Sequence, residues 1–370
     1  FTPWRPSTSA NESAIILAAL ENSELTYEKK HELNIGVALG FVDNRINVEF
    51  DWYRRNNFDL IGYTQTMGVG GVTTKLANDA TMESTGCEFT ISTTNIKTKD
   101  FKWTTDWIFG WAENTITKLD SRSQVYSLVN GVGRTEGRPI GALYSIPFAG
   151  LTEEGLPTFF IDAEHTQVVG PGNYAAIYFQ EYENIDYLKY EGTIDPKITG
   201  SFGNTFSWKG LKLNVFFTYS FGNVLRLDNL CPVYSSDYSD LTASMKEMKN
   251  RWMVPGDENV TTIPSIPTVR QMREIDALSN AYSAYNYSTE RVAKGDFIRL
   301  KELSLAYDLP KKYFEGQNAV SSFGVKLSAT NLWLAYADKK LNGRDPEYYN
   351  TGGVSSPVPR QFTLTVKLGF

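Results

Sequence analysis

Residues 359–370 read P-R-Q-F-T-L-T-V-K-L-G-F, and their apolar and polar side chains alternate. Phe362, Leu364, Val366, Leu368 and Phe370 fall on one face of an extended strand, and polar residues and glycine fall on the other. In a water-soluble sheet this apolar face and the free strand edge would promote association with other chains. A closed barrel, with lipid outside and water inside, covers both. We therefore expect the same alternation in the rest of the chain.

The alternation does recur along the chain. A hairpin is predicted at 33–53, where apolar residues at every second position flank a turn at Asp43 and Asn44. Its polar face carries Glu49 and Asp51, which suit a water-filled lumen better than a second core layer. Further alternating segments lie near 87–92, 101–111, 198–206, 211–221, 297–309 and 323–329. With the opening strand they give about nine antiparallel strands, an all-β chain.

The aromatic segment at 101–111 fits the thickness of a membrane. Phe101, Trp103, Trp107, Phe109 and Trp111 share one face. Ten residues at ~3.3 Å each and a tilt of ~45° span roughly 23 Å along the membrane normal, close to the ~25 Å apolar band of outer-membrane barrels. The segment is therefore predicted to cross the membrane with aromatic residues at its rims.

Composition excludes several classes of protein. The 370 residues include 21% charged and 14% aromatic residues, and no run of about 18 apolar residues could form a spanning helix. A net charge of -6 and a pI near 5.2 exclude nucleic acid as a partner, because no basic stripe could neutralise phosphates. Cys87 and Cys231 have no metal-binding spacing, and a single bridge between them stays open.

The predicted turns alternate between short and long, as in bacterial barrels with short periplasmic turns and long extracellular loops. The predicted organisation is an extracellular loop at 1–25 with one helical turn near 15–20, four strands at 26–113, a long extracellular insert at 114–195, two strands at 196–225, a second long insert at 226–294, and three strands at 295–370. The strand count is odd, whereas single-chain bacterial barrels have even counts. The chain is therefore expected to be part of a larger barrel, with its last strand ending in the periplasm and closing the barrel; a soluble β-sandwich or lectin-like array is the alternative.

Four ordered motifs near the C-terminus resemble a known family: G-D-F-I-R-L-K-E-L-S-L-A-Y-D-L-P (295–310), A-T-N-L-W (329–333), G-R-D-P-E (343–347) and the last strand. They resemble the end of SusC/RagA-type TonB-dependent transporters. Upstream segments at 25–53, 137–142, 195–204 and 251–257 are similar to the same family, so the resemblance covers nearly the whole chain.

The resemblance implies a barrel of about 22 strands around an N-terminal plug, of which this chain would form the C-terminal part without the plug. It also implies import of an oligosaccharide or a peptide across the bacterial outer membrane. The implied partners are a SusD-like surface lipoprotein, TonB acting through the upstream part, lipid and lipopolysaccharide, and a second SusC–SusD pair in a dimer. Arg299, Asn331 and Asp345 belong to the matching motifs and are expected to be structural.

Tyrosines of the two inserts are the candidate substrate-binding residues, because rigid amphipathic rings can stack on a sugar or peptide and donate a hydrogen bond. The candidates are Tyr174, Tyr178, Tyr182, Tyr234, Tyr238 and Tyr285. No cofactor is expected, although Asp257, Glu258 and Asn259 carry oxygens that a Ca²⁺ ion could use; a solvated acidic turn is favoured.

His31 and His165, the only histidines, lie in no recognisable nucleophile motif, so no enzyme activity is expected. The leading hypothesis is oligosaccharide import. Peptide import, a surface adhesin or lectin without transport, and a barrel enzyme are the alternatives.

Overall fold

The structure is a computed structural model, and it describes residues 2–4, 14–16, 22–68, 73–230, 246–310, 320–349 and 357–370. Within these residues nine strands form one antiparallel sheet. From one edge to the other the strands are β3 (Lys29–Phe41), β4 (Ile46–Gln65), β5 (Thr74–Lys97), β6 (Phe101–Leu119), β12 (Ile198–Trp208), β13 (Leu211–Phe221), β16 (Phe297–Asp308), β17 (Ser322–Ala337) and β18 (Gln361–Gly369).

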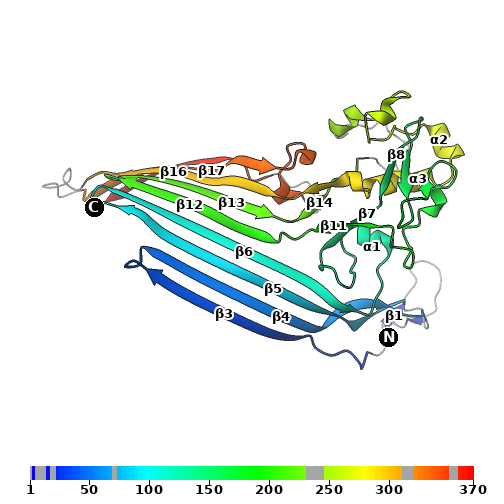
Figure 1. Cartoon of the computed structure of the whole chain (residues 1–370), viewed down its shortest axis with the longest axis horizontal. Helices are drawn as coiled ribbons and strands as arrows, with labels where there is room; N and C mark the ends of the chain where they lie inside the picture. Colours follow the sequence, from blue (N-terminus) through cyan, green and yellow to red (C-terminus); the bar gives the residue numbers. More distant parts are fainter. Residues whose placement is uncertain are drawn as a thin grey trace.

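The sheet is open at both edges. In the described part of the chain, β3 pairs only with β4 and β18 only with β17. The C-terminus lies at the end of the sheet where the short turns are, and the long inserts lie at the opposite end (Figure 1). This open sheet confirms the expectation that the chain alone does not close a barrel.

The apolar residues of neighbouring strands lie in register and form one continuous face. Val37, Phe50, Phe89 and Phe109 lie in one row across β3 to β6. Further along the sheet a row joins leucines of β13, β16, β17 and β18. The leucines of this second row are Leu213, Leu305, Leu327 and Leu364. This apolar face is the outer face that the alternation predicts.

A β-bulge breaks the alternation of β16 at Lys301. Phe217 pairs with Leu300 and the adjacent Phe216 with Glu302, so Lys301 is an extra residue of β16 against β13; the two register shifts against β17 place their extra residues on β17. A bulge adds one residue to one strand and so changes which side the following side chains face. Period-two reasoning alone could not assign the faces of Arg299 and Lys301.

β4, β5 and β6 are longer than a membrane crossing requires. They contain 20, 24 and 19 residues, whereas a tilted strand crosses the apolar layer in about 9–11. Near the middle of β4 and β5 the polar side chains of Arg54 and Glu83 lie 2.8 Å apart. The strand segments beyond this pair extend toward the inserts (Figure 1).

The two inserts fold together into one loop unit, which we define as residues 120–197 and 222–296 without the undescribed positions 231–245. Its elements are α1 (Val125–Val129), β7 (Ala142–Ser145), β8 (Phe148–Leu151), β9 (Pro157–Phe160), β10 (Val168–Val169), β11 (Lys189–Thr193), β14 (Val224–Arg226), α2 (Val269–Glu274), α3 (Leu278–Asn286) and β15 (Val292–Lys294), with 3-10 turns at Tyr174–Ala176, Lys246–Asn250, Asp257–Asn259 and Thr289–Arg291. None of the helices in the described residues is long and apolar enough to cross a membrane.

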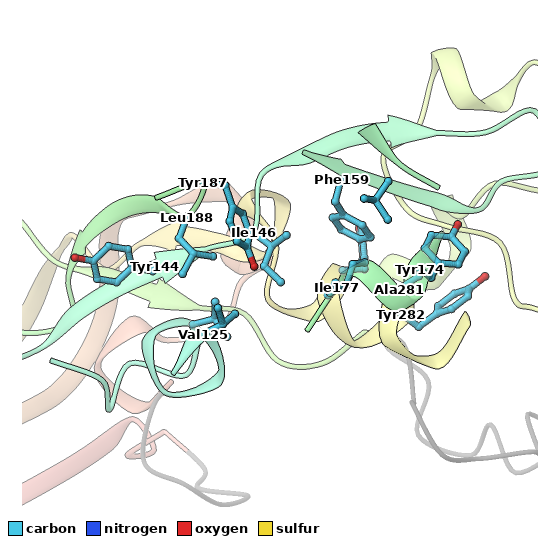
Figure 2. Close-up of a cluster of buried hydrophobic side chains, with 14 of the residues drawn as sticks. Val125, Tyr144, Ile146, Phe159, Tyr174, Ile177, Tyr187, Leu188, Ala281 and Tyr282 are labelled. Carbon is cyan, nitrogen blue, oxygen red and sulfur yellow. The ribbon is translucent and has the colours of Figure 1, made fainter. Parts of the chain in front are cut away.

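The core of the loop unit draws side chains from both inserts (Figure 2). Phe159 and Tyr174 of the first insert pack in one cluster with Ala281 and Tyr282 of the second. A bridge between Ile146 and Ser288 also joins the inserts. The inserts are therefore one folded body rather than two independent loops.

Arg226 ties this body together from inside. Its guanidinium donates to the backbone carbonyls of Ser288, Val129 and Tyr144, and it lies 5.9 Å from the ring centre of Tyr287. Burial lowers the pKa of Arg226 to about 10. One side chain thus fixes segments that are far apart in the sequence.

Two local expectations differ from the structure. The helical turn expected near 15–20 is not found at residues 14–16, which form β2 (Ala14–Ile16) paired with β1 (Thr2–Trp4); residues 17–21 lie outside the described part. β17 continues to Ala337, past the alternating segment predicted at 323–329, and Asn331, which takes a left-handed conformation (φ 53°), lies where the register with β16 shifts.

Candidate functional site

Cavities lie where the loop unit meets the far ends of the long strands. One of them, with a volume of about 1090 Å³, lies between the ends of β4 and β5 and the first insert. We call it the strand-end pocket. The residues used below to characterise it are Tyr63, Gln65, Asp79, Gln124, Arg134 and Tyr182. Its volume is slightly above the range of about 300–1,000 Å³ that is usual for small-molecule sites.

A second cavity of about 470 Å³, which we call the hairpin pocket, lies on the other side of segment 178–187. Asp162, Gln167, Tyr178 and Tyr187 line it. The Asp162 carboxylate accepts from the backbone N–H groups of Thr166 and Gln167, 2.9 and 2.7 Å away. These bonds outweigh the opposing effect of burial and lower the pKa of Asp162, so the rim of this pocket is held as a charged turn.

Segment 181–184, which separates the two pockets, is fixed by its own carboxylate. Glu181 accepts from the backbone N–H groups of Glu183 and Tyr182, both 2.8 Å away. Hydrogen bonds to the ionised form lower the pKa of Glu181 below its usual value. The bend directs Tyr182 to the strand-end pocket.

The predicted substrate-binding tyrosines separate into three groups. Tyr178 and Tyr182 line the hairpin and strand-end pockets, respectively. Tyr174 and Tyr285 are 0% and 1% exposed and pack in the core, so they support the loop unit and offer no surface to a cargo. Tyr234 and Tyr238 lie outside the described residues.

Sequence reasoning missed the residues that surround Tyr182. Gln65 lies at the end of β4, Gln124 directly before α1, and Arg134 in the loop after α1. No periodicity singles these residues out, because the fold brings them together from distant parts of the chain. Asp79, buried within β5, could only have been noticed as a charged residue in a strand.

The motif residues Arg299 and Asp345 form a buried ion pair, with Glu347 also near the guanidinium. This pair fastens the segment after β17 to β16. A cavity of about 710 Å³ lies beside it and is also lined by Asn331 and Arg344. The structural role expected for the motif residues therefore has a physical basis.

Asp257 and Glu258 use their carboxylates to close a turn. Asp257 accepts from the backbone N–H groups of Met253 and Val254, at 2.9 and 3.1 Å, and Glu258 accepts from Gly256 at 2.8 Å. In the described residues no group of three His, Cys, Asp or Glu side chains is arranged around a metal position. The solvated acidic turn without a bound Ca²⁺, which the sequence favours, stays a prediction.

The two histidines belong to different parts of the fold. His31 lies on the edge strand β3 beside the ring of Phe58, and His165 stacks on Phe160 in the loop unit. Cys87 is a free thiol of β5, in register with Trp52 and Trp111. Cys231 lies outside the described residues, so the structure does not describe a bridge.

The chain is similar in sequence to TonB-dependent receptors. TonB-dependent receptor P3 of Formosa agariphila is 27% identical over 97% of this chain and 36% of its own length, and receptor P26 of the same organism is also 27% identical, with the same coverage. TonB-dependent receptor SusC of Bacteroides thetaiotaomicron is 34% identical over 26% of this chain and 10% of its own length. No protein-family model matches. The chain thus spans about a third of the length of the relatives from Formosa agariphila.

Solved structures share the fold. The structure of the RagAB peptide transporter matches 98% of this chain and 37% of its own chain, with a TM-score of 0.72 and 24% identity. The RagAB peptide importer in its "open-open" state matches with a TM-score of 0.71 and 25% identity. By their names these relatives are receptors and transporters rather than enzymes. In sequence and in fold the chain is therefore similar to the C-terminal part of the barrel of SusC/RagA-type TonB-dependent receptors.

Proposed function

We propose that the chain forms part of a TonB-dependent importer in the bacterial outer membrane. The observation that carries this proposal is the continuous apolar face of nine strands, with a folded loop unit at one end and short turns at the other. Such a face suits lipid, and the opposite face carries Glu49, Asp51, Glu88 and Asp106, which suit water. The sequence relatives supply the receptor class.

The proposed orientation places the loop unit outside the cell and the short turns, with the C-terminus, in the periplasm. This follows the rule that outer-membrane barrels have long extracellular loops and short periplasmic turns. A SusD-like lipoprotein would cover the loop unit, TonB would act through a part outside this chain, and two such pairs would form a dimer.

The leading cargo is an oligosaccharide, and an oligopeptide is the second candidate. Hydroxyl, amide and aromatic groups of the strand-end pocket support the first. The likeness to a structure described as a peptide transporter supports the second.

Uptake in cells tests the proposal. A strain lacking the gene, and the same strain complemented, would be supplied with radiolabelled oligosaccharides or peptides, with and without an uncoupler that abolishes TonB action. We expect uptake only in the complemented, energised cells. Surface binding that never becomes uptake would show an adhesin, and recovery of the protein in the soluble fraction without detergent would exclude a membrane importer.

A further inference from the structure

We propose that the strand-end pocket is a saccharide-binding site centred on the hydroxyl of Tyr182 and the side-chain amides of Gln65 and Gln124. The inference rests on the proposed import function and adds to it a class of ligand and the residues that would bind this ligand.

The centre of the pocket is a hydrogen-bonded trio drawn from three parts of the chain. The amide nitrogens of Gln65 and Gln124 both donate to the hydroxyl oxygen of Tyr182, each over 2.6 Å. A phenol has two acceptor positions and one proton. With both acceptor positions in use, the proton of Tyr182 is left to donate to a ligand.

The trio therefore offers both kinds of hydrogen-bonding group. Tyr182 presents an O–H donor, and each glutamine retains a carbonyl oxygen that accepts and a second N–H that donates. Sugar hydroxyls donate and accept at the same time, so they match this mixed set. A ligand with acceptors only, such as a phosphate, matches it poorly.

The floor of the pocket holds a buried carboxylate that lacks a full set of partners. Asp79 is 1% exposed; its Oδ2 accepts from Ser121 Oγ over 2.7 Å, and its Oδ1 has no donor among the described residues. A buried acceptor without a donor is unfavourable. A ligand hydroxyl or a water molecule reaching the floor would supply the missing donor.

Gly62 shapes the floor beside this carboxylate. A Cβ atom at Gly62 would lie 3.2 Å from both an Arg134 guanidinium nitrogen and Asp79 Oδ2. The absence of a side chain thus lets both charged groups approach β4. Together they place an acceptor and a donor at the base of the pocket.

The ring of Tyr63 and the charged residues around the pocket restrict the class of ligand further. Tyr63 is 75% exposed and lies two residues before Gln65, so both side chains are on the same face of β4. Its ring can stack on a sugar. Four acidic residues, Asp79, Asp120, Glu181 and Glu183, and two basic residues, Arg122 and Arg134, line the pocket, so no excess of positive charge favours a polyanion.

The same walls disfavour a peptide bound as an added strand. β4 and β5 pair with each other along this stretch, from Leu60 with Ala80 to Gln65 with Thr74. Strand addition requires an open edge with free N–H and C=O groups. The groups left to the ligand are side chains, which suits a saccharide.

Calorimetry on the full-length protein, purified in detergent from outer membranes, tests the inference. The probes are neutral hexasaccharides of glucose, xylose and mannose units, and a hexapeptide as comparison. We expect at least one hexasaccharide to bind and Tyr182→Phe to weaken it about tenfold or more, because the ligand loses a donor and the amides lose their anchor. Tyr126→Phe is the matched control; Tyr126 lies in the same insert, is exposed and does not line the pocket.

Gln65→Ala changes the pocket from the strand side, so a matching loss in this variant cannot be due to misfolding of the loop. Binding of no hexasaccharide, equal binding by wild type and Tyr182→Phe, or a peptide whose binding depends on Tyr182 would each overturn the inference. If energised oligosaccharide uptake continues unchanged in Tyr182→Phe cells, the pocket assignment fails while import stands. If energised uptake of every cargo is absent in wild-type cells, import itself fails.

Discussion

At the scale of single residues, the loop unit depends on a few contacts between its two inserts. Gly155, with φ 75°, lies against the ring of Trp252 from the second insert. Arg226 connects three carbonyls inside the same body. Both contacts lie inside the loop unit and outside the nine-stranded sheet. The effect of a substitution there on the stability of the loop unit can therefore be measured separately from any effect on the sheet.

Substitution of Gly155 should loosen the junction between the inserts. A Cβ atom at this position would lie 2.4 Å from Cδ2 of Trp252, so the ring must move. We expect Gly155→Ala to destabilise the loop unit by about 2–4 kcal/mol, from left-handed strain and overpacking together. Gly137→Ala is the control, since Gly137 has the same φ of 75° with open space around it, and should cost only about 1–2 kcal/mol. Faster hydrogen exchange at Ser265 N–H, which donates to Gly155 O over 2.9 Å, reports the effect; equal effects of the two variants would contradict it.

Removal of the Arg226 guanidinium should weaken the same unit more broadly. Arg226→Met leaves the carbonyls of Ser288, Val129 and Tyr144 without this donor, and one such loss costs about 1–3 kcal/mol. We expect a loss of roughly 3 kcal/mol, seen as faster exchange throughout the loop unit with the sheet unchanged. Arg270→Met should be nearly neutral, because Arg270 is exposed and pairs only within α2. An unchanged loop unit in Arg226→Met would contradict the assigned role.

At the scale of elements, the bend at 181–184 should respond to pH. Its Glu181 has a pKa below the usual value because backbone N–H groups of Glu183 and Tyr182 donate to the ionised form. A group whose pKa is lowered by folding stabilises the fold above its unfolded pKa, and this contribution is lost as the pH falls through the lowered value. We expect exchange at the Tyr182 and Glu183 amides, corrected for intrinsic rates, to be constant above pH 5 and to accelerate below about pH 4.5. Glu181→Gln should lack this acid step and Glu183→Gln should keep it.

The two faces of β5 should tolerate charge differently. Phe89 lies on the apolar face, with its ring 4.6 Å from that of Phe50, and Thr90 is next to it on the polar face. A lysine at the lipid-facing midplane costs about 2–4 kcal/mol. We expect Phe89→Lys to reduce heat-resistant folded barrel in outer membranes strongly, whereas Thr90→Lys remains near wild type. Similar losses for both variants would argue against lipid on the apolar face.

The strands and their faces could be predicted because successive side chains of a strand point to opposite faces. The polarity of each residue therefore indicates which face it lies on. The alternation of Phe362, Leu364 and Val366 is enough to identify a strand and its outer face. The bulges near Arg299 could not be predicted, since they arise from pairing between strands. The sequence also could not show that Tyr174 is buried in the core whereas Tyr182 lines a pocket. Burial in an irregular loop unit depends on contacts between segments more than 50 residues apart, such as the contact of Tyr182 with Gln124.

At the scale of the whole molecule, the sheet has two unpaired edges in the described residues, β3 and β18. An edge with free N–H and C=O groups is unfavourable in lipid, so in the barrel both edges must be paired. The chain spans 36% of the length of its relative from Formosa agariphila, so the remaining strands of such a barrel are the proposed partners. In that arrangement the loop unit lies over one end of the closed barrel.

The central claim is that one face of this sheet contacts lipid and the other contacts water. Spin labels on single cysteines at Phe89 and Val366 of the apolar face, and at Thr90 and Thr365 of the polar face, test it most directly in the full-length protein in outer membranes, after Cys87 and Cys231 are replaced by serine. The account predicts that labels at 89 and 366 are relaxed by oxygen and not by a water-soluble nickel chelate, and that labels at 90 and 365 show the reverse. Equal access of the nickel chelate to both faces would contradict it.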